Sequence, residues 1–72
     1  MTKHELVKAA PKLLDRVLGN DYRTNEEKIE FIDFLEASLG RVADALEAED
    51  ADLNMPLVDL FGRLERERSK LK

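Results

Sequence analysis

Apolar residues recur at intervals of three and four positions along nearly the whole chain, and there is no stretch of alternating β-branched residues of the kind that a strand would show. This period places apolar side chains on one face of a helix. Of the 72 residues, 43% are hydrophobic, and there are only three glycines and two prolines. A disordered chain has less apolar content and more glycine and proline. We therefore predict an all-α fold, with a single helical domain over residues 1–72.

Three helices are expected, over residues 2–18, 25–49 and 55–70. The first two begin with a threonine that is followed three positions later by a glutamate, Thr2 with Glu5 and Thr24 with Glu27. In such a capping box each side chain satisfies a backbone N–H at the start of the helix. The spacing therefore predicts where these two helices begin.

Prolines, glycines and one asparagine mark the expected interruptions and ends of the helices. Pro11 lacks a backbone N–H and its ring pushes on the preceding turn, which predicts either a kink or break, or a second helix with Pro11 in its first turn. Gly40 costs about 1 kcal/mol relative to alanine and predicts a bend or a break. Gly19 and Asn20 together predict a left-handed stop after the first helix. Asn54 predicts the N-cap of the third helix, with Pro56 in its first turn.

Short connections between successive helices favour antiparallel neighbours, so we predict a small up-down-up three-helix bundle. The central helix, at roughly 25 residues, would overhang each neighbour by about 12 Å. Its second half carries an apolar seam of Leu39, Val42 and Leu46. A second copy lying antiparallel across that seam would cover it with one self-complementary patch. We therefore expect a homodimer that associates through these three residues.

Two phenylalanines in the first half of the central helix are candidates for either the core or the anchor of a partner interface. Phe34 lies at the edge of the apolar arc beside the polar face, so it is the one that we expect to be exposed. Tyr22, in the first connection, is expected to pack its ring over a helix end. The predicted protein-interaction residues are Phe31, Phe34, Leu39, Val42 and Leu46.

The chemistry-bearing residues form no pattern that is typical of a catalytic or metal site. There is no cysteine and one histidine, which leaves no partner for a transition-metal site. Asp50, Asp52 and Asn54 have the spacing of the first calcium-loop ligands, but Met55 and Phe61 replace the required glycine and glutamate. A helical bundle of this size rarely encloses a water-excluding pocket. We therefore predict no enzyme activity, no cofactor and no metal.

The charges are distributed in blocks, although the formal net charge is only −4. Arg63, Arg66 and Arg68 make the end of the chain basic, and bases of this kind can contact nucleic-acid phosphates. Glu65 and Glu67 alternate with them, and no second basic cluster extends the patch. A DNA-binding transcriptional regulator that uses these three arginines is therefore the alternative, and nucleic acid is not the expected partner.

The leading interpretation is a small non-catalytic module that binds a larger protein and occludes or tethers it, as an inhibitor, anti-activator or adaptor does. The chain has no apolar run of the length that a signal peptide or a membrane span needs. We therefore expect a cytoplasmic protein with no membrane association.

Overall fold

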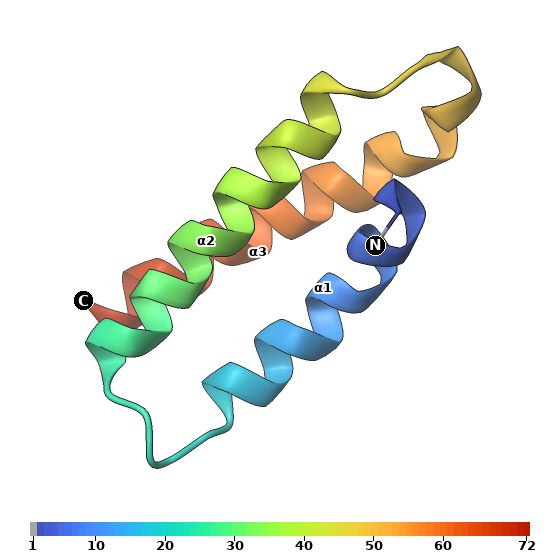
Figure 1. Cartoon of the computed structure of the whole chain (residues 1–72). Helices are drawn as coiled ribbons and strands as arrows, with labels where there is room; N and C mark the ends of the chain where they lie inside the picture. The colour runs from blue at the N-terminus through green and yellow to red at the C-terminus, as the bar shows by residue number, and fades with distance from the viewer. Residues whose placement is uncertain (1) are drawn as a thin grey trace.

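Residues 2–72 fold into three α-helices and one short 3-10 helix. The computed structural model describes residues 2–72, and these residues contain no strand, which confirms the all-α prediction. The molecule is elongated, with extents of 40 × 21 × 15 Å. The elements, shown in Figure 1, are α1 (Lys3–Leu18), α2 (Asn25–Asp44), η1 (Ala48–Leu53) and α3 (Asn54–Leu71).

The helices lie side by side, and polar contacts hold both ends of the bundle. Figure 1 shows the start of α1, in blue, beside the start of α3, and the end of α3, in red, beside the start of α2. The Asn25 side-chain amide donates to the Leu71 carbonyl at 3.4 Å. At the other end the Lys3 ammonium donates to the Ala45 carbonyl at 3.2 Å. Each helix contacts the other two, as a three-helix bundle requires.

One apolar stripe from each helix supplies the core, because spacings of three and four residues keep those side chains on one face. Burying a leucine, isoleucine or valine side chain stabilises the fold by about 1.5–3 kcal/mol. The buried apolar residues are Val7, Ala10, Leu14, Ile32, Leu35, Leu39, Val42, Leu53, Leu57, Leu60 and Leu64.

Both predicted helix starts are confirmed by the hydrogen bonds of their caps. The Thr2 hydroxyl accepts from the Glu5 backbone N–H at 3.2 Å. At α2 the box is reciprocal: the Thr24 hydroxyl accepts from the Glu27 N–H at 3.1 Å, and the Glu27 carboxylate accepts from the Thr24 N–H at 3.2 Å. These bonds satisfy N–H groups that have no partner within the helix.

The expected interruptions do not divide the helices. α1 runs unbroken through Pro11, and α2 runs unbroken through Gly40, so a break at either residue is wrong. Ala10 and Leu14, on either side of the proline, are buried, and their burial offsets the free energy that Pro11 costs within the helix. Gly19 has φ −83° and ψ 0°, so the predicted left-handed stop is also wrong. Its N–H instead donates to the Asp15 carbonyl at 2.9 Å.

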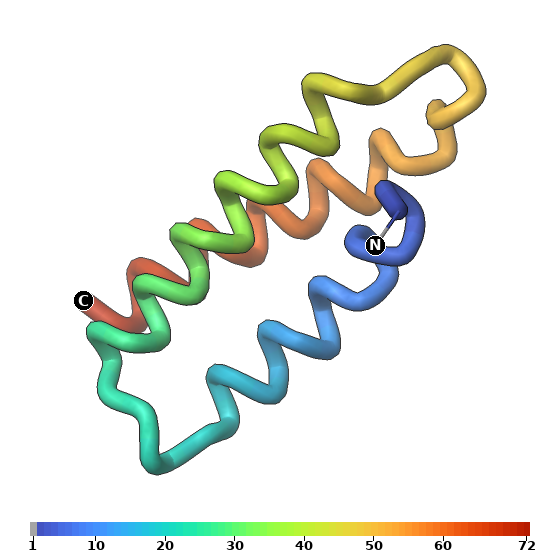
Figure 2. The backbone as a smooth tube through the Cα atoms, in the orientation of Figure 1, coloured from blue at the N-terminus to red at the C-terminus, as the bar shows by residue number. Residues whose placement is uncertain are grey.

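The central helix is shorter than predicted: it ends at Asp44, not at residue 49. Beyond that point the chain turns back, as Figure 2 shows, and forms η1. The Asp50 carboxylate accepts from the Glu47 N–H at 3.1 Å and pairs with Lys3 at 2.6 Å. The turn also buries Leu53 over the core. With 20 residues, against 16 in α1 and 18 in α3, α2 does not have the predicted overhang.

The third helix begins directly from η1. Leu53, the residue before it, already has helical backbone angles of φ −87° and ψ −12°. Asn54 is the first residue of α3, with φ −59° and ψ −52°, and lacks the extended conformation of an N-cap. Its predicted capping role is therefore wrong, whereas Pro56 does lie in the first turn of α3 as expected.

Candidate protein-interaction face

Phe34 is the large aromatic side chain that α2 presents to solvent. It is 66% exposed, in agreement with its predicted place at the edge of the apolar arc. Phe31 is half-buried and packs against the core. The centroids of the two rings are 6.3 Å apart, with a tilt of 38° between the planes. The pair therefore connects an exposed apolar surface to the core beneath it.

α1 also carries half-buried apolar side chains on the side away from α3. Asp15 of α1 pairs with Arg63 of α3, so it marks the side of α1 that α3 covers. Leu13 and Val17, each two positions from Asp15, lie about 160° around the helix from it. Both are half-buried. We call this surface the Phe34 face and define it by Leu13, Val17, Phe31, Phe34 and Ser38.

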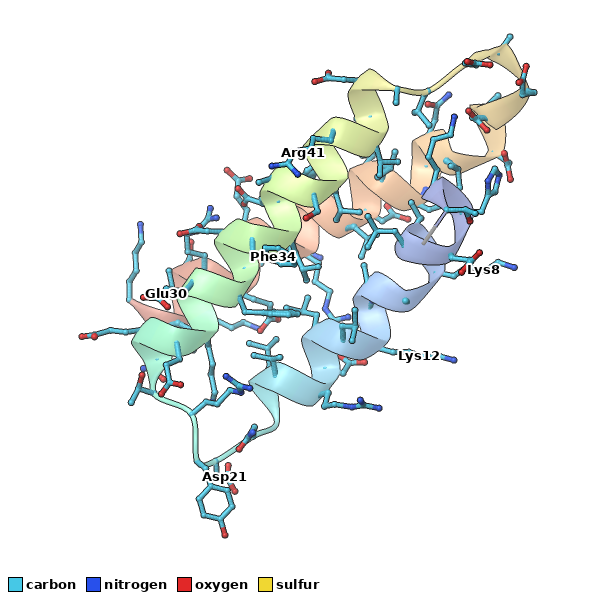
Figure 3. All side chains as sticks on the ribbon, viewed as in Figure 1. Lys8, Lys12, Asp21, Glu30, Phe34 and Arg41 are labelled. Atoms are coloured by element: carbon cyan, nitrogen blue, oxygen red, sulfur yellow. The ribbon has the colours of Figure 1, made fainter. Side chains whose placement is uncertain are left out.

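Phe31 faces away from α3 by the same geometry. Arg68 of α3 pairs with Asp33 and Glu36, which mark the side of α2 that lies against α3. Phe31 is two positions from Asp33, or about 160° around the helix. Figure 3 shows Phe34 on α2, between the labelled Glu30 at one side and Lys12 of α1 at the other.

Charged side chains border the Phe34 face on both edges. Lys8, Lys12 and Arg16 are exposed and follow each other at intervals of four along α1. Figure 3 shows Lys8 and Lys12 projecting from the outer edge of α1, with Glu30 at the outer edge of α2. Glu26 is exposed one turn before Glu30. Within residues 2–72, none of these five side chains forms an ion pair. This basic row was not predicted from the sequence, although its spacing of four is the signal for a shared helix edge.

The predicted self-association seam lies elsewhere. Leu39 is fully buried and Val42 is 7% exposed, because α1 and α3 cover the face of α2 on which they lie. Leu46 follows the end of α2 and is half-buried against the same core. The Phe34 face therefore includes Phe31 and Phe34 of the five predicted interaction residues and not the other three.

The basic end of α3 is largely engaged within the bundle. Arg63 pairs with Asp15 of α1. Arg68 contacts Glu36 at 2.8 Å and also pairs with Asp33. Its hydrogen bonds to Glu36 and then Asp33 raise the pKa of Arg68 above its ordinary value. Of the three arginines proposed to contact DNA, two are thus directed to carboxylates of the other helices. Arg66 is exposed.

The acidic segment between α2 and α3 is joined to the start of α1 through Asp50 and Lys3. Asp50 is 5% exposed, and the hydrogen bond from Lys3 at 2.6 Å, followed by that from the Glu47 backbone, lowers the pKa of its carboxyl. The same contact with Asp50 raises the pKa of Lys3. Residues 2–72 contain no group of three or more histidine, cysteine, aspartate or glutamate side chains placed to hold a metal ion.

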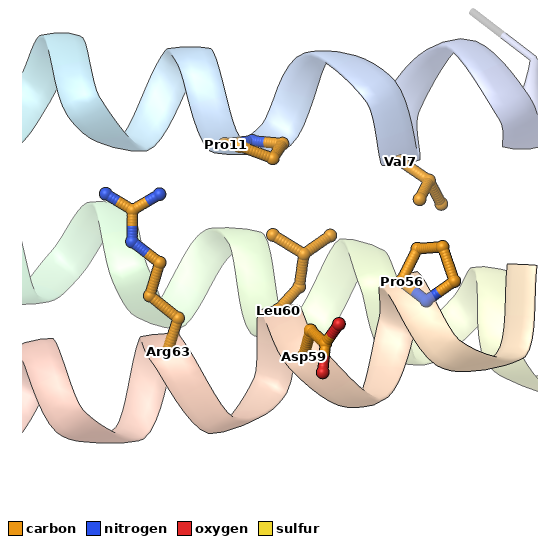
Figure 4. A pocket seen from close by; sticks show the side chains of 6 residues that line it. All are labelled: Val7, Pro11, Pro56, Asp59, Leu60 and Arg63. Atoms are coloured by element: carbon orange, nitrogen blue, oxygen red, sulfur yellow. The ribbon is translucent and has the colours of Figure 1, made fainter.

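A shallow hollow of about 340 Å³ lies between α1 and α3, and Figure 4 shows its lining. Val7 and Pro11 of α1 face Pro56 and Leu60 of α3 across it, so its walls are mainly apolar. Arg63 closes one end, with its guanidinium paired to Asp15 outside the hollow.

The prediction that Tyr22 packs its ring over a helix end is wrong. It is 98% exposed in the connection between α1 and α2. The side chain of Asn20 accepts from the Tyr22 backbone N–H at 2.9 Å, which orders this turn without the ring. Tyr22 is not among the residues that define the Phe34 face.

Comparison of the chain with protein-family models, with curated proteins and with solved structures found no match. None of the helices formed by residues 2–72 combines the length and the apolar character needed to cross a bilayer.

Proposed function

We propose that this protein is a small non-catalytic module that binds another protein through the Phe34 face and acts by occluding or tethering it. The observation that carries this proposal is the exposed Phe34 ring beside half-buried Phe31 on α2, with half-buried Leu13 and Val17 on the side of α1 away from Asp15. A rigid aromatic side chain within an apolar patch that is bordered by charges is typical of an interface anchor.

The proposal includes an up-down-up order of the three helices. The contacts of Lys3 with Ala45 at one end of the bundle, and of Asn25 with Leu71 at the other, support this order. In this arrangement α1 and α2 form one layer whose outer surface is the Phe34 face, and α3 backs it. A rigid two-helix surface of this kind suits docking against a helix or a second two-helix layer.

Site-specific photo-crosslinking tests the proposal directly. A photoreactive phenylalanine analogue replaces Phe34 in one variant and Tyr22 in a matched variant, and both are irradiated in cells of the natural source. We expect protein adducts from position 34 and few from position 22, although Tyr22 is the more exposed of the two. Equal adduct yields from the two positions, or none from position 34, would contradict the proposal. The mass of an adduct separates a second copy, at twice 8.3 kDa, from a different protein.

A further inference from the structure

The charges around the Phe34 face are arranged so that the face complements itself. Along α1, the exposed charges run from negative to positive: Glu5, then Lys8, Lys12 and Arg16. Along α2 the exposed side chains of Glu26 and Glu30 are negative and that of Arg41 is positive, and the exposed Asp44 follows Arg41 at the end of the helix. Within the described chain none of these eight side chains forms an ion pair, whereas Lys3, Arg63 and Arg68 all do.

The heights of these charges along the bundle are fixed by contacts at its ends. Lys3 of α1 lies beside Ala45 after α2, and Leu18 is joined to Asn25 by a short connection. With the same rise per residue in both helices, Glu5 lies level with Arg41 to within about one turn. Arg16 is level with Glu30 to the same precision.

A twofold axis parallel to the bundle would place opposite charges of the two copies against each other. Rotation about such an axis leaves the height of every residue unchanged and places α1 of one copy against α2 of the other. Arg16 then faces Glu30 of the second copy, and Glu5 faces its Arg41. The apolar centre of the face, around Phe34, is covered at the same time. A twofold axis perpendicular to the helices would instead place the lysine row of α1 against itself.

We infer that the occupant of the Phe34 face is a second copy of this chain, related by a twofold axis along the bundle. This inference rests on the interaction role proposed above and specifies its partner. Four helices, α1 and α2 from each copy, form the interface, and α3 lies outside it. The charges on the two edges fix the relative orientation of the copies, since like charges would meet if the twofold axis were perpendicular to the helices.

Sedimentation equilibrium over a series of concentrations tests the arrangement, with circular dichroism as the control for folding. The natural chain is expected to be a dimer that dissociates on dilution. Phe34→Asp is expected to raise the dimer Kd by about 30-fold or more, because it places a charge at the centre of the interface. Met55→Asp, at a side chain of nearly the same exposure on α3, is the matched control and is expected to leave the Kd unchanged.

A charge swap tests the orientation of the two copies. Arg16→Glu and Glu30→Arg, each alone, are expected to raise the Kd by roughly tenfold, because each creates two like-charge contacts. The variant that carries both substitutions restores opposite charges and is expected to return to within about threefold of the natural Kd.

A folded chain that stays monomeric at all concentrations would overturn the inference, as would a double variant no better than either single one. If such a chain still gave larger adducts from position 34, the interaction role would stand and only the identity of the occupant would be wrong. A dimer that is insensitive to Phe34→Asp would overturn the assigned face.

Discussion

Gly40 offers a test of whether α2 is one continuous helix. It lies inside α2, and a Cβ built at this position would meet nothing within 4 Å. Alanine is therefore accommodated without any change in packing. In a helix interior, alanine is more favourable than glycine by about 0.8–1.0 kcal/mol. In a domain of this size, 1 kcal/mol corresponds to roughly 4–8 °C in Tm, so we expect Gly40→Ala to raise Tm by about that amount.

Thermal unfolding followed by far-ultraviolet circular dichroism, at one protein concentration, measures the effect of Gly40→Ala. Gly19→Ala is the matched control, because its Cβ would lie 3.2 Å from the Asp15 carbonyl oxygen at the end of α1. That contact is tight, so the control is expected to gain less or to lose stability. An unchanged or lower Tm for Gly40→Ala would refute the continuous helix and would indicate that α2 bends at this residue.

Three further predictions concern the core, the helix cap and the pH dependence. Leu39→Ala, at a fully buried residue, is expected to lower the free energy of unfolding by about 2–5 kcal/mol in urea titrations. Thr24→Ala removes the reciprocal cap with Glu27 and is expected to cost about 0.5–2 kcal/mol in the same assay. Because the pKa of Asp50 is lowered from its ordinary 3.8, its pairing with Lys3 stabilises the fold above that pH, and the contribution is lost as the pH falls through the lowered value. Asp50→Asn should therefore remove this part of the acid sensitivity in a series of unfolding curves against pH.

Features that depend on neighbouring residues could be predicted from the sequence. The caps at Thr2 and Thr24 involve partners three positions away, and both helices begin where these pairs predicted. The exposure of Phe34 was also predictable, because its angle on the helix separates it from the buried stripe. Local spacing alone determines these features.

The end of α2 could not be predicted because it depends on contacts between distant residues. Asp50 is held by Lys3, which is 47 positions earlier in the chain, and Leu53 is buried only because the chain turns back over the core. Periodicity continued to residue 49 and gave no sign of this turn. Similarly, an apolar seam at Leu39 and Val42 is equally compatible with cover by a second copy and with cover by the other helices of the same chain. The structure buries both residues within the chain.

Oxidative footprinting by hydroxyl radicals tests the central claim, that another protein molecule covers the Phe34 face, most directly. Phe34 and Tyr22 are both exposed aromatic side chains, so Tyr22 serves as an internal reference in the same sample. If a second molecule covers the Phe34 face, the oxidation of Phe34 relative to Tyr22 falls as the protein concentration is raised through the association range and recovers on dilution. A ratio that stays constant across that range, in samples where a dimer forms, would show that the copies associate through a different surface and would contradict the account.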